Sequence, residues 1–188
     1  MEDETTLRTN QWLQNILDLQ SRSDNAFEFL EHVKVDLFPN EAYIVTPKGK
    51  IITEIVAYAT ARGITVIPEI EMPAHAMSAI AAYPELSCHK RPIGVPSGAV
   101  WPITDIYCAG QEETFDFIEE VLTEMLALFP SQYIHVGGDE ATHTEWERCP
   151  KCQLRMKEHQ LKNEHQLQSY FIKRIDDFLT SKGRTLIS

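Results

Sequence analysis

The chain has 188 residues, 43% of them hydrophobic and 24% charged, a composition that allows one globular domain with an ordinary core. Its 28 acidic residues outnumber its 17 Lys and Arg, and the formal net charge of −11 disfavours a nucleic-acid binder. The sequence has no apolar run of about 18 residues, so no membrane span is predicted. No apolar stretch follows the acidic N-terminus, so no signal peptide is predicted.

The first 50 residues are expected to form two short helices and a short strand. Apolar side chains at spacings of three and four predict helices over residues 12–20 and 27–37, and a β-prone run covers residues 42–46. Residues 5–50 resemble the segment that enters the TGS domain of the stringent-response guanosine tetraphosphate synthetase/hydrolases. We expect residues 1–50 to lie outside the domain that follows.

From residue 51 onwards, the chain alternates between helical and strand patterns. Helices are expected at 51–59, 74–82, 115–129 and 164–181, and strands at 64–67, 133–136 and 184–187. The β-branched run at 64–67 is expected to be buried on both faces. Alternating strands and helices favour an α/β fold with a parallel sheet.

Polar residues follow two of the predicted strands. One group is Glu69, Glu71 and His75, and the other is the Gly-Gly-Asp-Glu sequence at 137–140. Because functional sites form at the carboxyl ends of parallel strands, we expect one shared cleft. Of Glu69 and Glu71, one is expected to face this cleft and the other to be structural, and the sequence leaves open which.

Asp139 and Glu140 are adjacent carboxylates at a glycine turn. Burial and mutual repulsion are expected to raise the pKa of one of them, which leaves a proton donor beside a charged partner. Acid-catalysed cleavage of a glycosidic bond needs such a pair. His135, on the strand before the turn, is expected to pack or to support the site.

Residues 51–188 resemble glycoside hydrolase family 20, the β-N-acetylhexosaminidases. The matching stretches keep the family's order along the chain and lie at 61–73, 82–88, 137–140, 146–152 and 168–175. The resemblance implies a (β/α)₈ barrel. Because a full barrel needs about 250 residues, the chain is expected to hold about strands 3 to 5 with their helices.

The resemblance also implies roles for individual residues. Family members use the substrate's own 2-acetamido oxygen as the nucleophile. Glu140 is then the general acid, Asp139 orients the acetamide, and His75 supports the acid without touching the substrate itself. Ala74 stands where the family has glycine, which implies strain if that position has positive φ.

The cysteines leave alternatives open. Cys149 and Cys152 form a lone Cys-x-x-Cys, for which zinc would need two further ligands, and Cys88 and Cys108 are the candidates. A Cys88–Cys108 disulfide is the alternative in an exported protein, and free thiols are the default in a cytoplasmic one. We expect no bound metal and no cofactor.

The sequence therefore predicts an incomplete β-N-acetylhexosaminidase that removes terminal β-linked N-acetylhexosamine weakly or not at all. The alternatives are a non-enzymatic truncated fusion protein, and a nucleotide-linked module suggested by the N-terminal resemblance. The expected partners are N-acetylhexosamine-containing glycans, with no nucleic acid and no membrane. Self-association through exposed barrel edges is also expected. The compartment and the glycan linkage stay open.

Overall fold

The computed structural model describes residues 49–94 and 104–188. The helices predicted at 12–20 and 27–37 and the strand predicted at 42–46 lie outside the described residues. The chain divides into two compact units, Met1–Val66 and Ile67–Ser188. In the first unit, helix α2 (Gly49–Thr60) confirms the helix predicted at 51–59.

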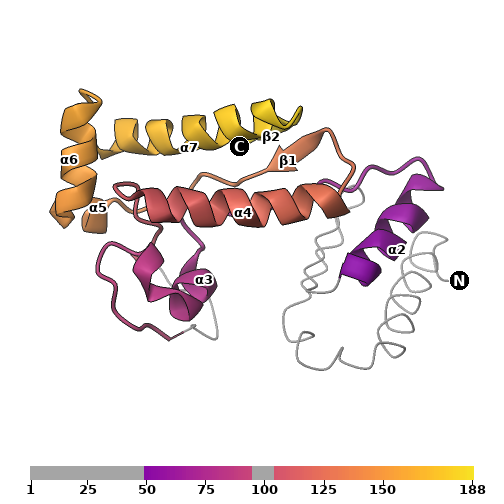
Figure 1. Ribbon diagram of the computed structural model, residues 1–188, viewed down its shortest axis with the longest axis horizontal. Helices are drawn as coiled ribbons and strands as arrows, with labels where there is room; N and C mark the ends of the chain where they lie inside the picture. The colour runs from indigo at the N-terminus through magenta and orange to yellow at the C-terminus, as the bar shows by residue number, and fades with distance from the viewer. Residues whose placement is uncertain (1–48, 95–103) are drawn as a thin grey trace, which may run out of the picture. The chain divides into compact units, whose positions relative to one another are not determined.

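The second unit alternates helices with short strands (Figure 1). Its elements in chain order are α3 (Met77–Ala82), the 3-10 turn η3 (Pro84–Leu86), α4 (Glu112–Leu128), β1 (Tyr133–His135), α5 (Thr144–Arg148), α6 (Pro150–Glu158), α7 (Glu164–Ser181) and β2 (Thr185–Ile187). The predicted helices at 115–129 and 164–181 and the predicted strands at 133–136 and 184–187 are confirmed. Helix α3 is shorter than predicted, and α5 and α6 were not predicted because neither carries a long apolar stripe.

β1 is the central one of three parallel segments. On one edge it pairs with β2 in a register that places Ile134 opposite Leu186. On the other edge it runs beside residues 68–72, where the Ile70 N–H donates to the His135 carbonyl at 3.0 Å. Parallel neighbours need a long crossover, and α5, α6 and α7 provide it between β1 and β2.

The strand predicted at 64–67 is wrong in its position. Hydrogen bonding to β1 begins at Pro68, whose carbonyl accepts from the His135 N–H at 3.0 Å. Ile64 and Ile67 are 56% and 39% exposed, instead of buried on both faces. A β-branched run favours extended backbone, but a ladder forms only where a neighbouring strand is aligned with it, and β1 is aligned with the residues that follow.

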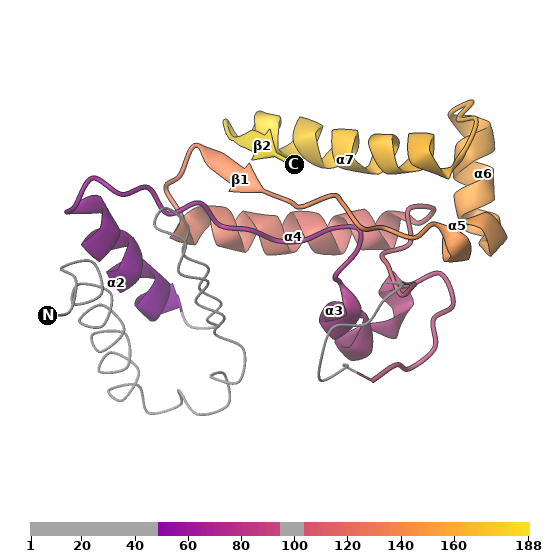
Figure 2. The ribbon, with the colours of Figure 1, turned by 180° about the vertical axis from the view of Figure 1, so that it is seen from behind.

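The core lies between the helices and one face of the strands, and α4 and α7 run side by side there (Figures 1 and 2). The rings of Phe115 on α4 and Phe171 on α7 are 4.9 Å apart between centroids, and both side chains are fully buried. Helix α7 also buries Leu167, Ile175 and Leu179. The apolar spacing of residues 164–181 predicts a buried face made of Leu167, Phe171, Ile175 and Phe178. The first three are buried, and Leu179 is buried in place of Phe178.

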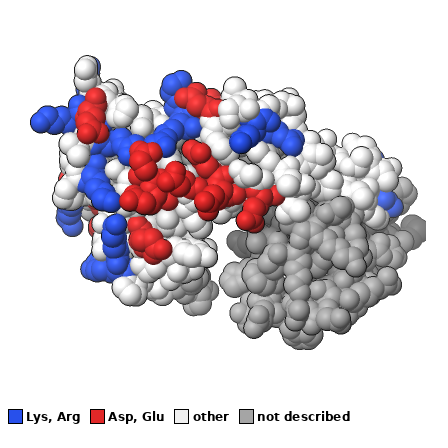
Figure 3. Space-filling model, viewed as in Figure 1, with Lys and Arg blue, Asp and Glu red and all other residues white. Residues whose placement is uncertain are grey.

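The exposed side of α4 is acidic. Figure 3 shows a band of acidic side chains along this helix, with Lys and Arg of α6 and α7 around it. Glu112 contacts two of these cations, Arg155 at 2.6 Å and Arg174 through a hydrogen bond of 2.9 Å. These contacts join the N-terminal turn of α4 to both neighbouring helices. Within the described ranges, no helix combines the length and apolar character that crossing a bilayer requires.

Candidate functional site

The loops after residues 68–72 and after β1 meet at the carboxyl ends of these strands. His75 in the first loop and Glu140 in the second are in direct contact, with 2.8 Å between Nε2 and Oε2. The structure thus brings together two predicted site residues that are 65 positions apart in the sequence. The parallel pairing of residues 68–72 with β1 is what aligns the two loops.

The backbone at this contact is unusual. His75 and Glu140 have φ of 49° and 52°, a left-handed conformation that non-glycine residues seldom adopt. Such strain costs about 1 kcal/mol or more per residue and persists where the surrounding structure enforces it, often at functional sites. Positive φ falls on His75 and not on Ala74, so the strain considered for Ala74 is absent.

Asp139 and Glu140 are both exposed, and the Glu140 side chain is 52% accessible. The burial on which the predicted acid–base pair depended is therefore not found at these two residues. The Gly137-Gly138 turn carries both carboxylates beyond the end of β1, and the His75 side chain contacts the Glu140 carboxylate there.

Glu71 is the carboxylate that lies against the glycine turn. Its Oε1 accepts from the Gly138 N–H at 2.9 Å. A Cβ built on Gly137, which has φ of 62°, would lie 1.9 Å from the Glu71 carboxylate, so the turn and this side chain fit together only with glycine. Burial raises the pKa of Glu71, and the Gly138 hydrogen bond and the nearby His75 oppose this effect. Sequence reasoning did not assign Glu71 this role.

Glu69 and His135 form a second pair on the same side of the strands. His135 Nδ1 lies 3.2 Å from Glu69 Oε1 and 3.1 Å from the Gly137 nitrogen. Nδ1 can donate to Glu69 only when this nitrogen carries a hydrogen, and it can accept from the Gly137 N–H only when this nitrogen carries none. The ring therefore makes one of these two hydrogen bonds at a time. The prediction that only one of Glu69 and Glu71 faces the site was wrong, because residues two apart in a strand share a face.

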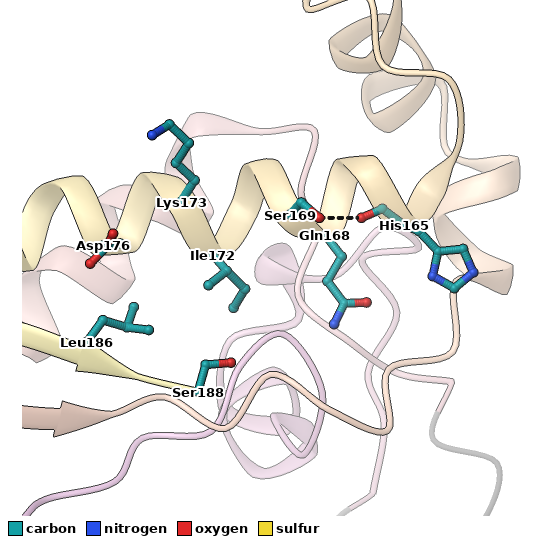
Figure 4. Close-up of a pocket in the computed structure, with 8 residues that line it drawn as sticks. All are labelled: His165, Gln168, Ser169, Ile172, Lys173, Asp176, Leu186 and Ser188. Carbon is teal, nitrogen blue, oxygen red and sulfur yellow. Dashed lines mark hydrogen bonds between the residues drawn. The ribbon is translucent and has the colours of Figure 1, made fainter.

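An open hollow of about 590 Å³ follows α7 and the end of β2 (Figure 4). Its lining residues are His165, Gln168, Ser169, Ile172, Lys173, Asp176, Leu186 and Ser188. The hollow adjoins the glycine turn, because Gln168 Nε2 donates to the Gly138 carbonyl at 2.6 Å. Gln168 also contacts His143 Nε2 at 2.6 Å, so this side chain connects α7 to the loop after the turn. No predicted site residue lines the hollow.

The four cysteines converge on one point in the second unit. Their Sγ atoms all lie within 4.8 Å of one another. Cys108 is 3.7 Å from Cys152 and 3.8 Å from Cys149, and Cys88 is 3.7 Å from Cys152. All four are free, so the structure contains no Cys88–Cys108 disulfide. Cys108, Cys149 and Cys152 are buried, and Cys88 is half-buried.

Parallel strands joined by helices, with polar side chains gathered at the carboxyl ends of the strands, define part of a (β/α)₈ barrel. The model of glycosyl hydrolase family 20, catalytic domain, matches residues 40–188. The chain belongs to glycosyl hydrolase family 20. The comparisons support this part of the predicted resemblance and give no support to the resemblance of residues 5–50 to the stringent-response proteins.

Relatives and solved structures agree with this family. A β-hexosaminidase of Porphyromonas gingivalis is 49% identical over 137 residues, which are 72% of this chain and 17% of that protein. A β-hexosaminidase of Akkermansia muciniphila is 36% identical over 70% of this chain and 27% of its own length. The crystal structure of β-N-acetylhexosaminidase from Bacteroides fragilis has a TM-score of 0.67 and 43% identity, over 73% of this chain and 26% of that one. The chain thus spans about a sixth to a quarter of these relatives.

Proposed function

We propose that the chain is part of a β-N-acetylhexosaminidase, with Glu140 as the general acid. The contact of 2.8 Å between His75 and Glu140 is the observation that carries this proposal. It places a titratable partner on the carboxylate that the family resemblance selects as the acid. The substrates would be glycans that end in β-linked N-acetylhexosamine, the sugar for which the Bacteroides fragilis β-N-acetylhexosaminidase is named.

The proposed chemistry needs one proton and no protein nucleophile. The 2-acetamido oxygen of the sugar bonds to the anomeric carbon while the glycosidic bond breaks, and Glu140 gives its proton to the departing oxygen. Asp139, the neighbouring carboxylate, orients the acetamide and stabilises the positive charge that develops on it. Water then opens the cyclic intermediate, and Glu140 takes back a proton. His75 positions the Glu140 carboxyl group throughout.

Glu71 and the Glu69–His135 pair support this turn from the strands. The Glu71 carboxylate accepts a hydrogen bond from the Gly138 N–H, and His135 Nδ1 contacts the Gly137 nitrogen. Both glycines precede Asp139 directly, so these contacts set where the proposed catalytic carboxylates leave the strand. We propose a positioning role for His135 and Glu71.

The test is hydrolysis of an aryl N-acetyl-β-glucosaminide. Slow release of the phenol is expected from the wild-type chain, and Glu140→Gln is expected to lower the rate by about 10²-fold or more because the amide cannot donate the proton. Glu147→Gln, which changes an exposed carboxylate of α5, is the matched control and should keep the wild-type rate. Equal rates for wild type and Glu140→Gln would remove Glu140 from the role of acid.

The observed exposure favours a second candidate, a chain without turnover. The His75 and Glu140 side chains are 45% and 52% accessible, whereas acid catalysis gains from exclusion of water. This candidate predicts no phenol release from any variant, with self-association on size exclusion and a broad calorimetric transition. A monomer with a sharp transition would contradict it. The division of the chain into residues 1–50 and a catalytic domain at 51–188 stays a prediction.

A further inference from the structure

We propose that Cys88, Cys108, Cys149 and Cys152 bind one structural zinc ion. This site is independent of the proposed hydrolase chemistry, and it replaces the expectation from the sequence that the chain binds no metal. The four sulfur atoms come from three separate segments of the chain, and all of them point to one centre.

The sulfur spacing matches a tetrahedral thiolate site. Zinc–sulfur bonds of about 2.3 Å at tetrahedral angles place neighbouring sulfur atoms about 3.8 Å apart. Three pairs in this cluster are 3.7, 3.7 and 3.8 Å apart, and no sulfur lies further than 4.8 Å from another. A disulfide would need two sulfur atoms at about 2.05 Å, far closer than any of these pairs. The widest pair, at most 4.8 Å apart, needs to close by about 1 Å or less to reach the tetrahedral spacing.

The ligand set also has the chemistry of a structural site. Four cysteines, with two of them in a Cys-x-x-Cys turn, form a closed set that leaves no coordination position for substrate. Binding as thiolates releases four protons from the four thiols, and the cluster needs groups that offset the remaining negative charge. Helix α6 begins directly after Cys149, so its N-terminus faces the cluster with positive partial charge.

The surrounding packing supports a rigid centre. Gly110 lies directly against the Cys-x-x-Cys turn, because a Cβ built on it would be 2.2 Å from the Cys152 nitrogen. Trp146, fully buried three residues before Cys149, donates from Nε1 to the Tyr107 carbonyl at 2.9 Å. Backbone packing at Gly110 and the Trp146 hydrogen bond beside Cys108 therefore hold the segments that carry the cysteines together.

The zinc ion would hold the site loop in place indirectly. Tyr107, next to Cys108, donates its N–H to the Pro73 carbonyl at 3.0 Å, and Pro73 lies two residues before His75. An anchored Cys108 thus restrains Tyr107, whose N–H holds the backbone at the start of the His75 loop. Loss of the metal should loosen this loop without changing any residue of the proposed acid–base machinery.

The experiment measures metal and thiols in the full 188-residue chain, produced with zinc in the medium. Elemental mass spectrometry is expected to find about one zinc per chain, and thiol titration in denaturant with chelator is expected to find all four cysteines reduced. Cys152→Ser should lose the zinc, and Lys151→Ala, an exposed change inside the same turn, should keep it. Chelator should lower the melting temperature of the wild-type chain but not of Cys152→Ser.

A second measurement does not depend on the folding of a variant. Cobalt(II) added to the metal-free wild-type chain should give the visible absorption bands of tetrahedral thiolate coordination, and zinc should abolish them. Disulfides without metal, four reduced thiols that bind neither metal, or a site filled only by iron would each overturn the proposal. Because none of these measurements uses glycoside hydrolysis, their failure is separate from a failure of the hydrolase proposal.

Discussion

Gly110 offers the sharpest test of the packing around the cysteines. A Cβ at this position would lie 2.2 Å from the Cys152 nitrogen and within 2.6 Å of the carbonyl group of Lys151. All of these atoms belong to backbone, so no side chain can rotate away to make room. Gly110→Ala therefore forces the 108–110 segment and the start of α6 apart.

The expected cost is at the upper end for overpacking, about 3 kcal/mol. For a unit of the size of Ile67–Ser188, this free energy corresponds to a fall in melting temperature of about 10 °C. Thermal unfolding followed by circular dichroism or calorimetry measures it. The fall should persist in the presence of chelator, because the clash is between backbone atoms and does not depend on a metal.

Gly94→Ala is the matched control. A Cβ on Gly94 meets no atom within 4 Å, and its φ is not positive, so the same change in composition should leave the melting temperature within about 1 °C of wild type. If Gly110→Ala melts as the wild-type chain does, the close packing of the two segments is wrong, and the geometry that supports the zinc proposal fails with it.

The remaining predictions concern charge and core. Hydrogen bonds from Arg174 and Arg155 hold the pKa of Glu112 at about 2, below its usual 4.5. This stabilisation is present above pH 4.5 and is lost as the pH falls toward 2, so Glu112→Gln should cost about 1 kcal/mol in urea unfolding at pH 7 and little at pH 2. A pH-independent cost would contradict the ion pair. The charge of Glu71 has the opposite effect on stability from that of Glu112, since burial raises the pKa of Glu71. The deprotonated form opposes folding above its unfolded pKa, so Glu71→Gln should raise stability at pH 7 and lose this advantage in acid, and a variant less stable at pH 7 would refute this. Trp146→Phe keeps a buried ring but leaves a carbonyl unpaired, which should cost about 1–3 kcal/mol by the same measurement; an unchanged stability would show that water replaces the donor.

The helices show how far periodicity alone reaches. The apolar spacing in residues 164–181 predicted the bounds of α7 because one face of the helix must bury a continuous stripe. The same rule found α4, and it failed for α5 and α6, which are short and held by the buried Trp146 and the cysteines. The apolar periodicity of the sequence was thus enough to locate a helix only where the helix packs against the core along its whole length.

The site divides in the same way. The Gly-Gly-Asp-Glu turn and its place after a strand were predictable from the sequence, because a glycine pair and adjacent carboxylates are local features. The sequence did not determine the contact of His75 with Glu140, or the position of Glu71 against Gly137. Both depend on the parallel register between β1 and residues 68–72, which hydrogen bonds between distant segments decide.

The cysteines depend most on tertiary structure. As a sequence, Cys149 and Cys152 are a pair with two unassigned companions, and nothing in their spacing tells whether Cys88 and Cys108 are near. The antiparallel bridge between Ser87 and Tyr107 brings the companions side by side, and the packing of α6 then delivers the other two. Four sulfur atoms can share one centre only when three chain segments have folded against each other, because a metal site of this kind is a property of long-range geometry and not of local order.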